Sequence, residues 1–304
     1  MFRLHTSNDA ATLADELGRR LRAQAGGNPL APALVLVPQA GLKRWLQVHL
    51  AQKLGVVANV EFVEPARFAW RLLHAARPDL PRQSPFEPDV LRWHLHALLG
   101  EPLDGDALAP LREYLAGDGD PLRRYALSGE LAHVFERMQG YRRGKLLRWE
   151  RHGPDRGDAP SERWLAELWR RLLKRVGGAS RAARVEAWLA AHDPGSGAAA
   201  KPAPAGLPQH LSAFACANVS PDVLRMLGVA ARHCELDFFL PLPSREYLGD
   251  TPQTRRAARE WLEQKDGGNP LIVSLGGAAA GLIELLYGYE HVQPDEEVER
   301  FDAG

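Results

Sequence analysis

The stretch MFRLHTSNDAATLADELGRRL, residues 1–21, decides the fold class, because it joins a short strand, a turn and an amphipathic helix. Leu13 and Leu17 lie four positions apart and begin an apolar stripe on that helix. Many phosphate-binding α/β domains begin with this unit, and their turn is rich in glycine and ends in Gly-Lys-Ser/Thr. Here the turn from His5 to Asp9 has neither glycine nor lysine. The sequence therefore predicts the strand, turn and helix that frame a nucleotide site, but not the residues that would bind the phosphates of the nucleotide.

Apolar runs of strand length recur along the chain and predict a parallel sheet. Such runs suit parallel strands that are buried on both faces, and the helices between them supply right-handed crossovers. The runs expected to form strands are residues 2–5, 33–39, 58–62, 211–216 and 233–240. Ligands of open parallel sheets bind beyond the carboxyl ends of the strands. The turns expected to matter are therefore residues 5–9, 38–41, 63–67 and 217–220.

The order of the elements predicts an interrupted α/β lobe. Residues 65–193 read almost wholly as helices, and strand-like runs return only after the flexible stretch PGSGAAAKPAPAG at 194–206. We expect residues 1–64 and 207–304 to form the lobe, 65–193 to form an all-helical insertion, and 194–206 to be a linker. The polar ending VERFDAG, residues 298–304, predicts that the natural chain continues.

Composition narrows the class of protein. The formal net charge of the 304 residues is zero, so overall charge says nothing about nucleic acid. Cys216 and Cys234 each lie in an apolar run and are expected to be buried reduced thiols. The first 25 residues are charged and amphipathic, and no apolar run approaches the roughly 20 residues that span a bilayer. We expect a cytoplasmic protein.

No catalytic or metal site is recognisable in the sequence. Besides the missing glycine and lysine, the strand at 211–216 leads into Ala217-Asn218, without the acidic pair that would hold magnesium. His94 and His96 are two apart on an expected helix and do not share a face. Paired CxxC and HExxH motifs are also missing. We therefore expect no ATP hydrolysis, no metal and no cofactor in this chain.

Basic residues cluster in the helical segment, with aromatic residues between them. Five basic residues and one acid lie between Arg142 and Arg151, and seven basic residues and one acid lie between Arg163 and Arg184. Arginine binds phosphate, and aromatic rings stack on unpaired bases. The alternative is that these arginines form solvated helix faces, and that three tryptophans on apolar stripes are core residues: Trp93, Trp164 and Trp169.

The stretch ALSGELAHVFERMQGYR, residues 126–142, sharpens this question. Its expected buried side carries Leu127, Leu131, Val134, Phe135 and Met138. His133, Glu136 and Arg137 share another face at i, i+3 and i+4. Such a polar patch could read base edges, or it could be a surface ion cluster of little consequence.

Five stretches together resemble the N-terminal part of the RecC family, the gamma subunit of exodeoxyribonuclease V. They occur in family order and spacing over essentially the whole chain, which would correspond to about the first third of a family member. The stretches are RLHTSN (3–8), VPQAGLKRWLQVHLAQKLGVVANVEFVEPARFAW (37–70), ALSGELAHVFERMQGYR (126–142), GLPQHLSAFACANVSPDVLRML (206–227) and NPLIVSLG (269–276).

The resemblance implies a helicase-like, P-loop-type lobe whose catalytic residues have been lost. It implies a non-catalytic subunit, without a cofactor of its own, held between a RecB-like helicase–nuclease subunit and a RecD-like helicase subunit. Such a subunit separates duplex DNA, guides the single strands and scans one of them for the Chi signal in recombinational repair. Two alternatives stay open: a structural adaptor that does not read DNA, and an ATP-driven helicase with an unusual phosphate loop.

The resemblance also implies DNA-binding residues, taken position by position. Trp70 and Arg142 match the family residue, and Arg181 in SRAARVEAW matches over a loosely aligned stretch. His133 replaces a family aspartate, whereas Glu136 keeps the acidic character of its position.

Other implied positions depart from the family pattern. Arg137 lies beside the acidic position on the same face. Gln39 and Ala40 stand in a turn where the best-known pattern has glutamine and threonine, and Glu64 replaces an apolar residue. We expect the strand channel to be retained and the DNA sequence that it recognises to differ.

Overall fold

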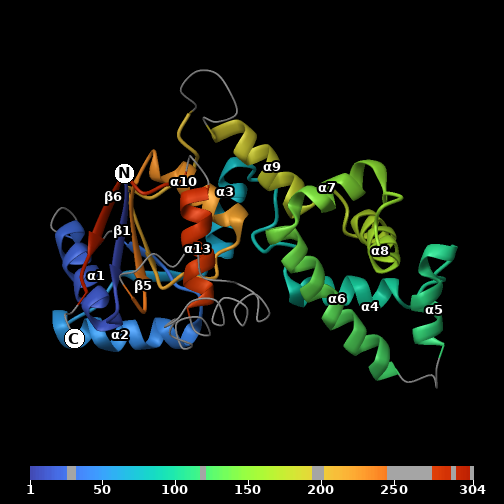
Figure 1. Ribbon diagram of the computed structural model, residues 1–304, viewed down its shortest axis with the longest axis horizontal. Coiled ribbons are helices and arrows are strands. Elements are labelled where there is room, and N and C mark those ends of the chain that lie inside the picture. Colours follow the sequence, from blue (N-terminus) through green and yellow to red (C-terminus); the bar gives the residue numbers. More distant parts are fainter. Residues whose placement is uncertain (26–31, 117–120, 194–201, 245–275, 289–291, 302–304) are drawn as a thin grey trace, which may run out of the picture. The chain divides into compact units, whose positions relative to one another are not determined.

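The computed structural model describes residues 1–25, 32–116, 121–193, 202–244, 276–288 and 292–301 (Figure 1). Contacts divide the chain into two compact units. One comprises Met1–Ala76 with His192–Gly304, and we call it the α/β unit; the other comprises Arg77–Ala191, and we call it the helical unit. The helical unit therefore begins later than residue 65, the boundary expected from the sequence. Most of the expected linker, and most of the NPLIVSLG stretch, lie outside the described residues.

The α/β unit is built on a six-stranded parallel sheet. The strands are β1 (Phe2–Ser7), β2 (Ala33–Leu36), β3 (Val60–Val63), β4 (His210–Phe214), β5 (Glu235–Pro241) and β6 (Glu296–Glu299). Their order is β3-β2-β4-β5-β1-β6, and each neighbouring pair is parallel. Val35 of β2 pairs with Ser212 of β4, so apolar strands from both sides of the helical segment share one sheet. The predicted parallel α/β arrangement is confirmed.

Helices with one apolar side accompany the sheet. They are α1 (Ala10–Ala25), α2 (Ala40–Leu54), α3 (Pro65–Ala76), α10 (Pro221–Ala231) and α13 (Gly277–Gly288). Leu13 and Leu17 of α1 are fully buried with Val35 and Phe214 of the sheet, as the four-residue spacing predicts. Cys216 and Cys234 are buried free thiols, also as predicted, and burial raises the pKa of Cys216 to about 12.

Strand β6 was not expected from the sequence, because EEVE is polar. In Figure 1 it lies beside β1, and the backbone amides of Asp295 and Arg300 donate to Phe2 and Thr6 at 2.8 Å. An edge strand needs little apolar surface, so its hydrogen bonds and the strand beside it determine its conformation. Residues 296–299 therefore belong to the sheet although their hydrophobic pattern does not predict a strand.

A charged network between α1 and the sheet joins β1, β5 and β6. Buried His5 contacts Asp237 at 3.0 Å, and Arg300 reaches Glu16 of α1 at 3.0 Å. Burial disfavours the charge of Asp237, but the hydrogen bond from His5 and the charge of Arg20 outweigh it and hold the pKa of Asp237 below its usual value. The network attaches α1 to three strands, so His5 belongs to a buried strand and not to an open turn.

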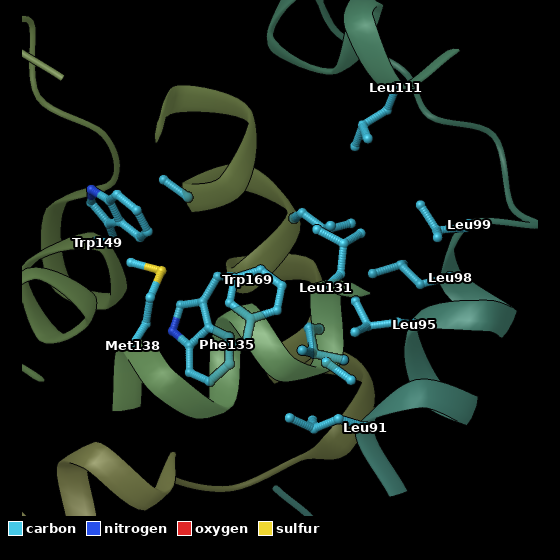
Figure 2. Close-up of a cluster of buried hydrophobic side chains, with 14 of the residues drawn as sticks. Leu91, Leu95, Leu98, Leu99, Leu111, Leu131, Phe135, Met138, Trp149 and Trp169 are labelled. Carbon is cyan, nitrogen blue, oxygen red and sulfur yellow. The ribbon is translucent and has the colours of Figure 1, made fainter. Parts of the chain in front are cut away.

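The helical unit has its own apolar core. Its elements are α4 (Pro88–Leu98), η1 (Asp106–Leu108), α5 (Ala109–Leu115), α6 (Pro121–Tyr141), α7 (Arg143–His152), α8 (Pro160–Val176) and α9 (Arg181–His192). Figure 2 shows Leu131, Phe135 and Met138 of α6 gathered with Trp149 and Trp169 of the two following helices. The apolar stripe predicted for residues 127–138 therefore faces the core. Among the described residues, no helix is both long enough and apolar enough to cross a bilayer.

Candidate nucleic-acid interface

The polar face of α6 lies at the surface of the helical unit. His133 and Arg137 are exposed, and Glu136 is partly buried on the same helix. Arg181, the first residue of α9, approaches this face: its guanidinium lies 3.4 Å from the Glu136 carboxylate and 3.2 Å from the Glu136 carbonyl oxygen. The fold therefore brings together two expected site residues that are 45 positions apart in the chain.

Helix α6 ends at Tyr141, and Arg142 caps the start of α7. With φ −129° and ψ 37°, Arg142 has a non-helical backbone, which separates the two helices. Its side chain is 64% exposed, and its guanidinium makes a long contact with Glu162, at 3.8 Å. Arg142 is therefore a cation that is positioned by the helix junction and accessible to solvent.

A cavity of about 470 Å³ opens beside this junction. Arg137, Arg142 and Glu162 give it polar groups, and the edges of aromatic and aliphatic side chains complete it. The other lining residues are Val134, Met138, Tyr141, Trp149 and Leu165. A concave surface that combines two guanidinium groups with the exposed ring of Tyr141 has the chemistry to hold a phosphate and an unpaired base.

Arg137 differs from the other basic residues at this junction. Within the described part of the chain it forms no ion pair, although it borders the cavity. Burial, reinforced by the charge of Glu136, raises the pKa of Tyr141 above its ordinary value, so its hydroxyl stays protonated and can donate a hydrogen bond at neutral pH. The junction thus offers one unpaired cation, one weakly paired cation and one phenol.

Two further cations of the first basic cluster, Lys145 and Arg148, are neutralised by acids from α8 and its preceding loop. Lys145 pairs with Glu162 and lies 3.4 Å from Asp158, and Arg148 lies 2.6 Å from Asp155. Asp158 also accepts hydrogen bonds from the Trp149 indole at 2.8 Å and from a backbone amide. These cations form ion pairs within the protein. The number of basic residues in the sequence cluster therefore overstates the positive charge that is available to a ligand.

The second basic cluster is likewise largely paired. Arg171 contacts Glu167 at 3.1 Å, Arg175 pairs with Glu101, and Arg181 pairs with Glu136. A solvated or paired helix face is therefore the better interpretation for residues 163–184. This was the alternative to DNA binding in the sequence analysis. The acids that compensate it were not recognised from the sequence, because Glu101 and Glu136 lie far from their partners in the chain.

Two tryptophans differ in exposure from the expectation. Trp93 is 61% exposed on α4, whereas its place on an apolar stripe predicted a core residue. Trp70 is 4% exposed within the α/β unit, so its ring packs inside that unit and offers little face to a base. Trp169 is fully buried, as predicted, and Trp164 is partly buried against the same core.

The remaining expected residues lie at the carboxyl ends of β2 and β3 in the α/β unit. Gln39 caps α2 through its backbone, and Ala40 is the first residue of that helix; both are exposed. Glu64 is exposed and forms a 3.8 Å pair with Arg67. The expected site residues are therefore divided between the two units, with the basic ones on the helical unit.

The turn after β1 places a carboxylate of the protein at the start of α1. The carboxylate of Asp9 accepts from the amides of Ala11 and Thr12 at 2.9 and 3.1 Å, and from the Thr12 hydroxyl. The bond from Ala11 and then that from Thr12 hold the pKa of Asp9 below its usual value. Free amides at a helix N-terminus are what bind phosphate, and here a protein carboxylate already takes them. Asp9 therefore caps α1.

The family model described as the RecC N-terminal domain matches residues 2–302. The chain belongs to the RecC family. Three relatives are each called RecBCD enzyme subunit RecC. The relative from Escherichia coli is 26% identical over 96% of this chain, that from Haemophilus influenzae 27% over 84%, and that from Mycolicibacterium smegmatis 31% over 93%. The matches cover 29%, 24% and 25% of those relatives, so the chain spans less than a third of a RecC protein.

Proposed function

We propose that this RecC-family chain is part of a non-catalytic, DNA-binding subunit of an exonuclease V-type complex. Its role is in recombinational repair of double-strand breaks: it separates strands, guides single strands and recognises Chi. The observation that carries the proposal is the cavity at the α6–α7 junction, where Arg137 and Arg142 remain accessible while neighbouring cations are paired. RecB-like and RecD-like subunits are the proposed partners, and single-stranded and duplex DNA the ligands, in the cytoplasm.

The α/β unit is proposed to be a helicase-like lobe that has lost its nucleotide site. This interpretation rests on the parallel sheet and on the Asp9 carboxylate, which takes the α1 amides that would otherwise bind a phosphate. Isothermal titration with Mg-ATP should show no saturable binding. Saturable binding that is lost when Ser7 and Asn8 are both replaced by alanine would defeat this part of the proposal.

The proposed DNA contacts fall into two roles. Arg137 and Arg142 bind phosphate, since both are exposed guanidinium groups bordering the cavity. His133 and Glu136 read base edges, with Arg181 holding the Glu136 carboxylate in position at 3.4 Å. On the α/β unit, Gln39, Ala40 and Glu64 are proposed as further DNA contacts of that unit, whereas Trp70 contributes by packing.

The roles are separable in an assembled complex that carries variant subunits. Arg142→Ala should weaken binding to all single-stranded sequences about equally and lower the slope of log affinity against log salt by about one. Glu136→Gln should instead change preference at one base, by roughly 1–3 kcal/mol. Arg151→Ala is the matched control, because this arginine is exposed but paired with Glu186 and lies outside the cavity.

The competing proposal is a structural adaptor that assembles its partners without reading DNA. It is favoured by the extensive pairing of the basic clusters. If complexes carrying Arg137→Ala, Arg142→Ala and Glu136→Gln together assemble normally and load and pause on DNA like the parent, the DNA-reading assignment is wrong and the adaptor should replace it.

A further inference from the structure

A second surface of the helical unit combines exposed aromatic rings with arginines. We call it the aromatic patch: Arg92, Trp93 and His96 of α4, with Arg124 and Tyr125 of α6. The Trp93 ring centroid lies 6.0 Å from that of Tyr125 and 6.1 Å from that of His96. The ring centroids of His96 and Tyr125 are 6.4 Å apart. The rings of Trp93 and Tyr125 are both exposed.

The geometry of the patch is fixed by contacts between the two helices. Arg92 lies over the Tyr125 ring, 5.1 Å from its centroid, and donates to the Tyr125 hydroxyl at 3.0 Å. A Cβ atom at Gly129 would come within 2.9 Å of the Arg92 guanidinium, so glycine in the middle of α6 makes room for that side chain.

A similar arrangement holds the second arginine. The Arg124 guanidinium donates to the His96 ring at 3.3 Å, and a Cβ atom at Gly100 would come within 2.6 Å of it. The patch is therefore pre-organised: rings and guanidinium groups are held in place before any ligand binds, which lowers the entropic cost of binding.

The charges of the patch are not compensated by acids in the part of the chain that the structure describes. Neither Arg92 nor Arg124 has a carboxylate within ion-pair distance there, unlike most arginines of α7 and α8. The neighbouring Arg123 lies over the Tyr114 ring, 5.5 Å from its centroid, and adds a third cation. Asp89, one turn before Trp93, is the acid of α4. The surface remains basic beside exposed rings.

We propose that the aromatic patch binds single-stranded DNA without sequence preference, with a base stacked on Trp93 and the backbone phosphates at Arg92 and Arg124. Exposed rings beside cations that no described carboxylate pairs with are complementary to a strand of stacking bases and negatively charged phosphates. The inference rests on the proposed DNA-binding function but concerns a separate site. Tyr125 and Tyr141 lie at opposite ends of α6, about 24 Å apart along the helix at its usual rise per residue.

The test is fluorescence anisotropy of a labelled oligothymidylate titrated with the 304-residue chain at low salt. Loss of a stacked ring should raise Kd by about 5- to 150-fold for Trp93→Ala, from the usual alanine-substitution cost of base stacking, whereas Trp93→Phe should keep most of the affinity. Arg124→Ala should raise Kd and lower the salt slope by about one. Arg156→Ala removes an exposed arginine of the same unit outside the patch and is the control.

The outcomes separate this inference from the proposed function. If Arg142→Ala weakens oligothymidylate binding while Trp93→Ala and Arg124→Ala do not, the patch is not a DNA site and the proposed function survives. If the patch variants weaken binding and Arg142→Ala does not, the patch stands and the α6–α7 assignment fails. Unchanged DNA binding by Trp93→Ala together with lost assembly with partner subunits would make the patch a protein interface and overturn the inference, as would no binding of oligothymidylate by the parent chain.

Discussion

Replacing Asp158 with alanine should destabilise the helical unit by about 3 kcal/mol, the sum of two buried hydrogen bonds to a charged acceptor. The Asp158 side chain is 5% exposed, and one of its oxygens accepts from the Trp149 indole at 2.8 Å and from the Asp155 amide at 2.9 Å. The other oxygen lies 3.3 Å from Arg148 and 3.4 Å from Lys145. Trp149 is fully buried, so the variant leaves an indole N–H without a partner in the core.

The matched control is Asp155→Ala. The Asp155 side chain is 49% exposed and pairs with Arg148 at 2.6 Å, so its loss should cost less than about 1 kcal/mol, as for other surface ion pairs. Urea titration followed by tryptophan fluorescence measures both variants, and a melt should shift by about 4 °C or more per kcal/mol for a unit of this size. If Asp158→Ala and Asp155→Ala differ by less than 1 kcal/mol, the hydrogen bonds to Asp158 do not stabilise the fold as argued.

The same group gives a pH dependence with a defined sign. Burial opposes the charge of Asp158, but the bonds from the Asp155 amide and the Trp149 indole, with the charge of Lys145, outweigh it and hold the pKa of Asp158 below its ordinary value. Its stabilising effect is therefore complete above the unfolded pKa of about 4 and is lost as pH falls through the lower folded value. The stability difference between the parent and Asp158→Asn should shrink on acidification below about pH 4. A difference that stays constant down to pH 2 would contradict the assignment.

Three further substitutions test local features by chemical denaturation. Ala215 has φ +52°, a left-handed backbone that glycine adopts more easily than other residues. Ala215→Gly should therefore leave the α/β unit as stable or up to about 1 kcal/mol more stable, whereas Ala215→Val should destabilise it. The reverse order would show that the backbone there is not left-handed. Both side-chain polar atoms of buried Gln139 lack a hydrogen-bond partner among the residues that the structure describes, so Gln139→Met should raise stability by about 1 kcal/mol. A loss of stability would reveal a partner for the amide. Trp70→Ala should lower the free energy of unfolding by about 3–5 kcal/mol, because it truncates a core side chain. Trp45→Ala, at an exposed tryptophan, should lower it far less. Equal losses of stability would argue against burial of Trp70.

The sequence predicted much of the sheet because burial on both faces leaves a local signal. The strands at 33–36, 210–214 and 235–241 are apolar runs, and each lies within or beside the expected range. The last of these begins at Glu235 and not at His233, because the amides of His233 and Cys234 still bond to Ala230 of α10. Boundaries depend on hydrogen bonds to other elements, which a single sequence does not contain.

The candidate site was predicted less completely, because a side chain's availability depends on its partners. The polar face of α6 followed from helical periodicity alone. The neutralisation of Lys145 by Glu162 could not be read from the sequence, and neither could the approach of Arg181 to Glu136. Cation counts identify where charge is concentrated, but only the fold shows which cations are already paired.

The sequence by itself determined the parallel α/β class, a first turn without the glycine and lysine that bind phosphate, and the amphipathic helix that carries His133 and Arg137. The period of the apolar residues and the residue types of a turn are properties of the chain itself. The tertiary structure alone decided that EEVE forms strand β6, that Trp70 is buried and that Trp93 is exposed. Edge pairing and burial depend on which distant segments come to lie beside a residue, and long-range packing fixes those neighbours.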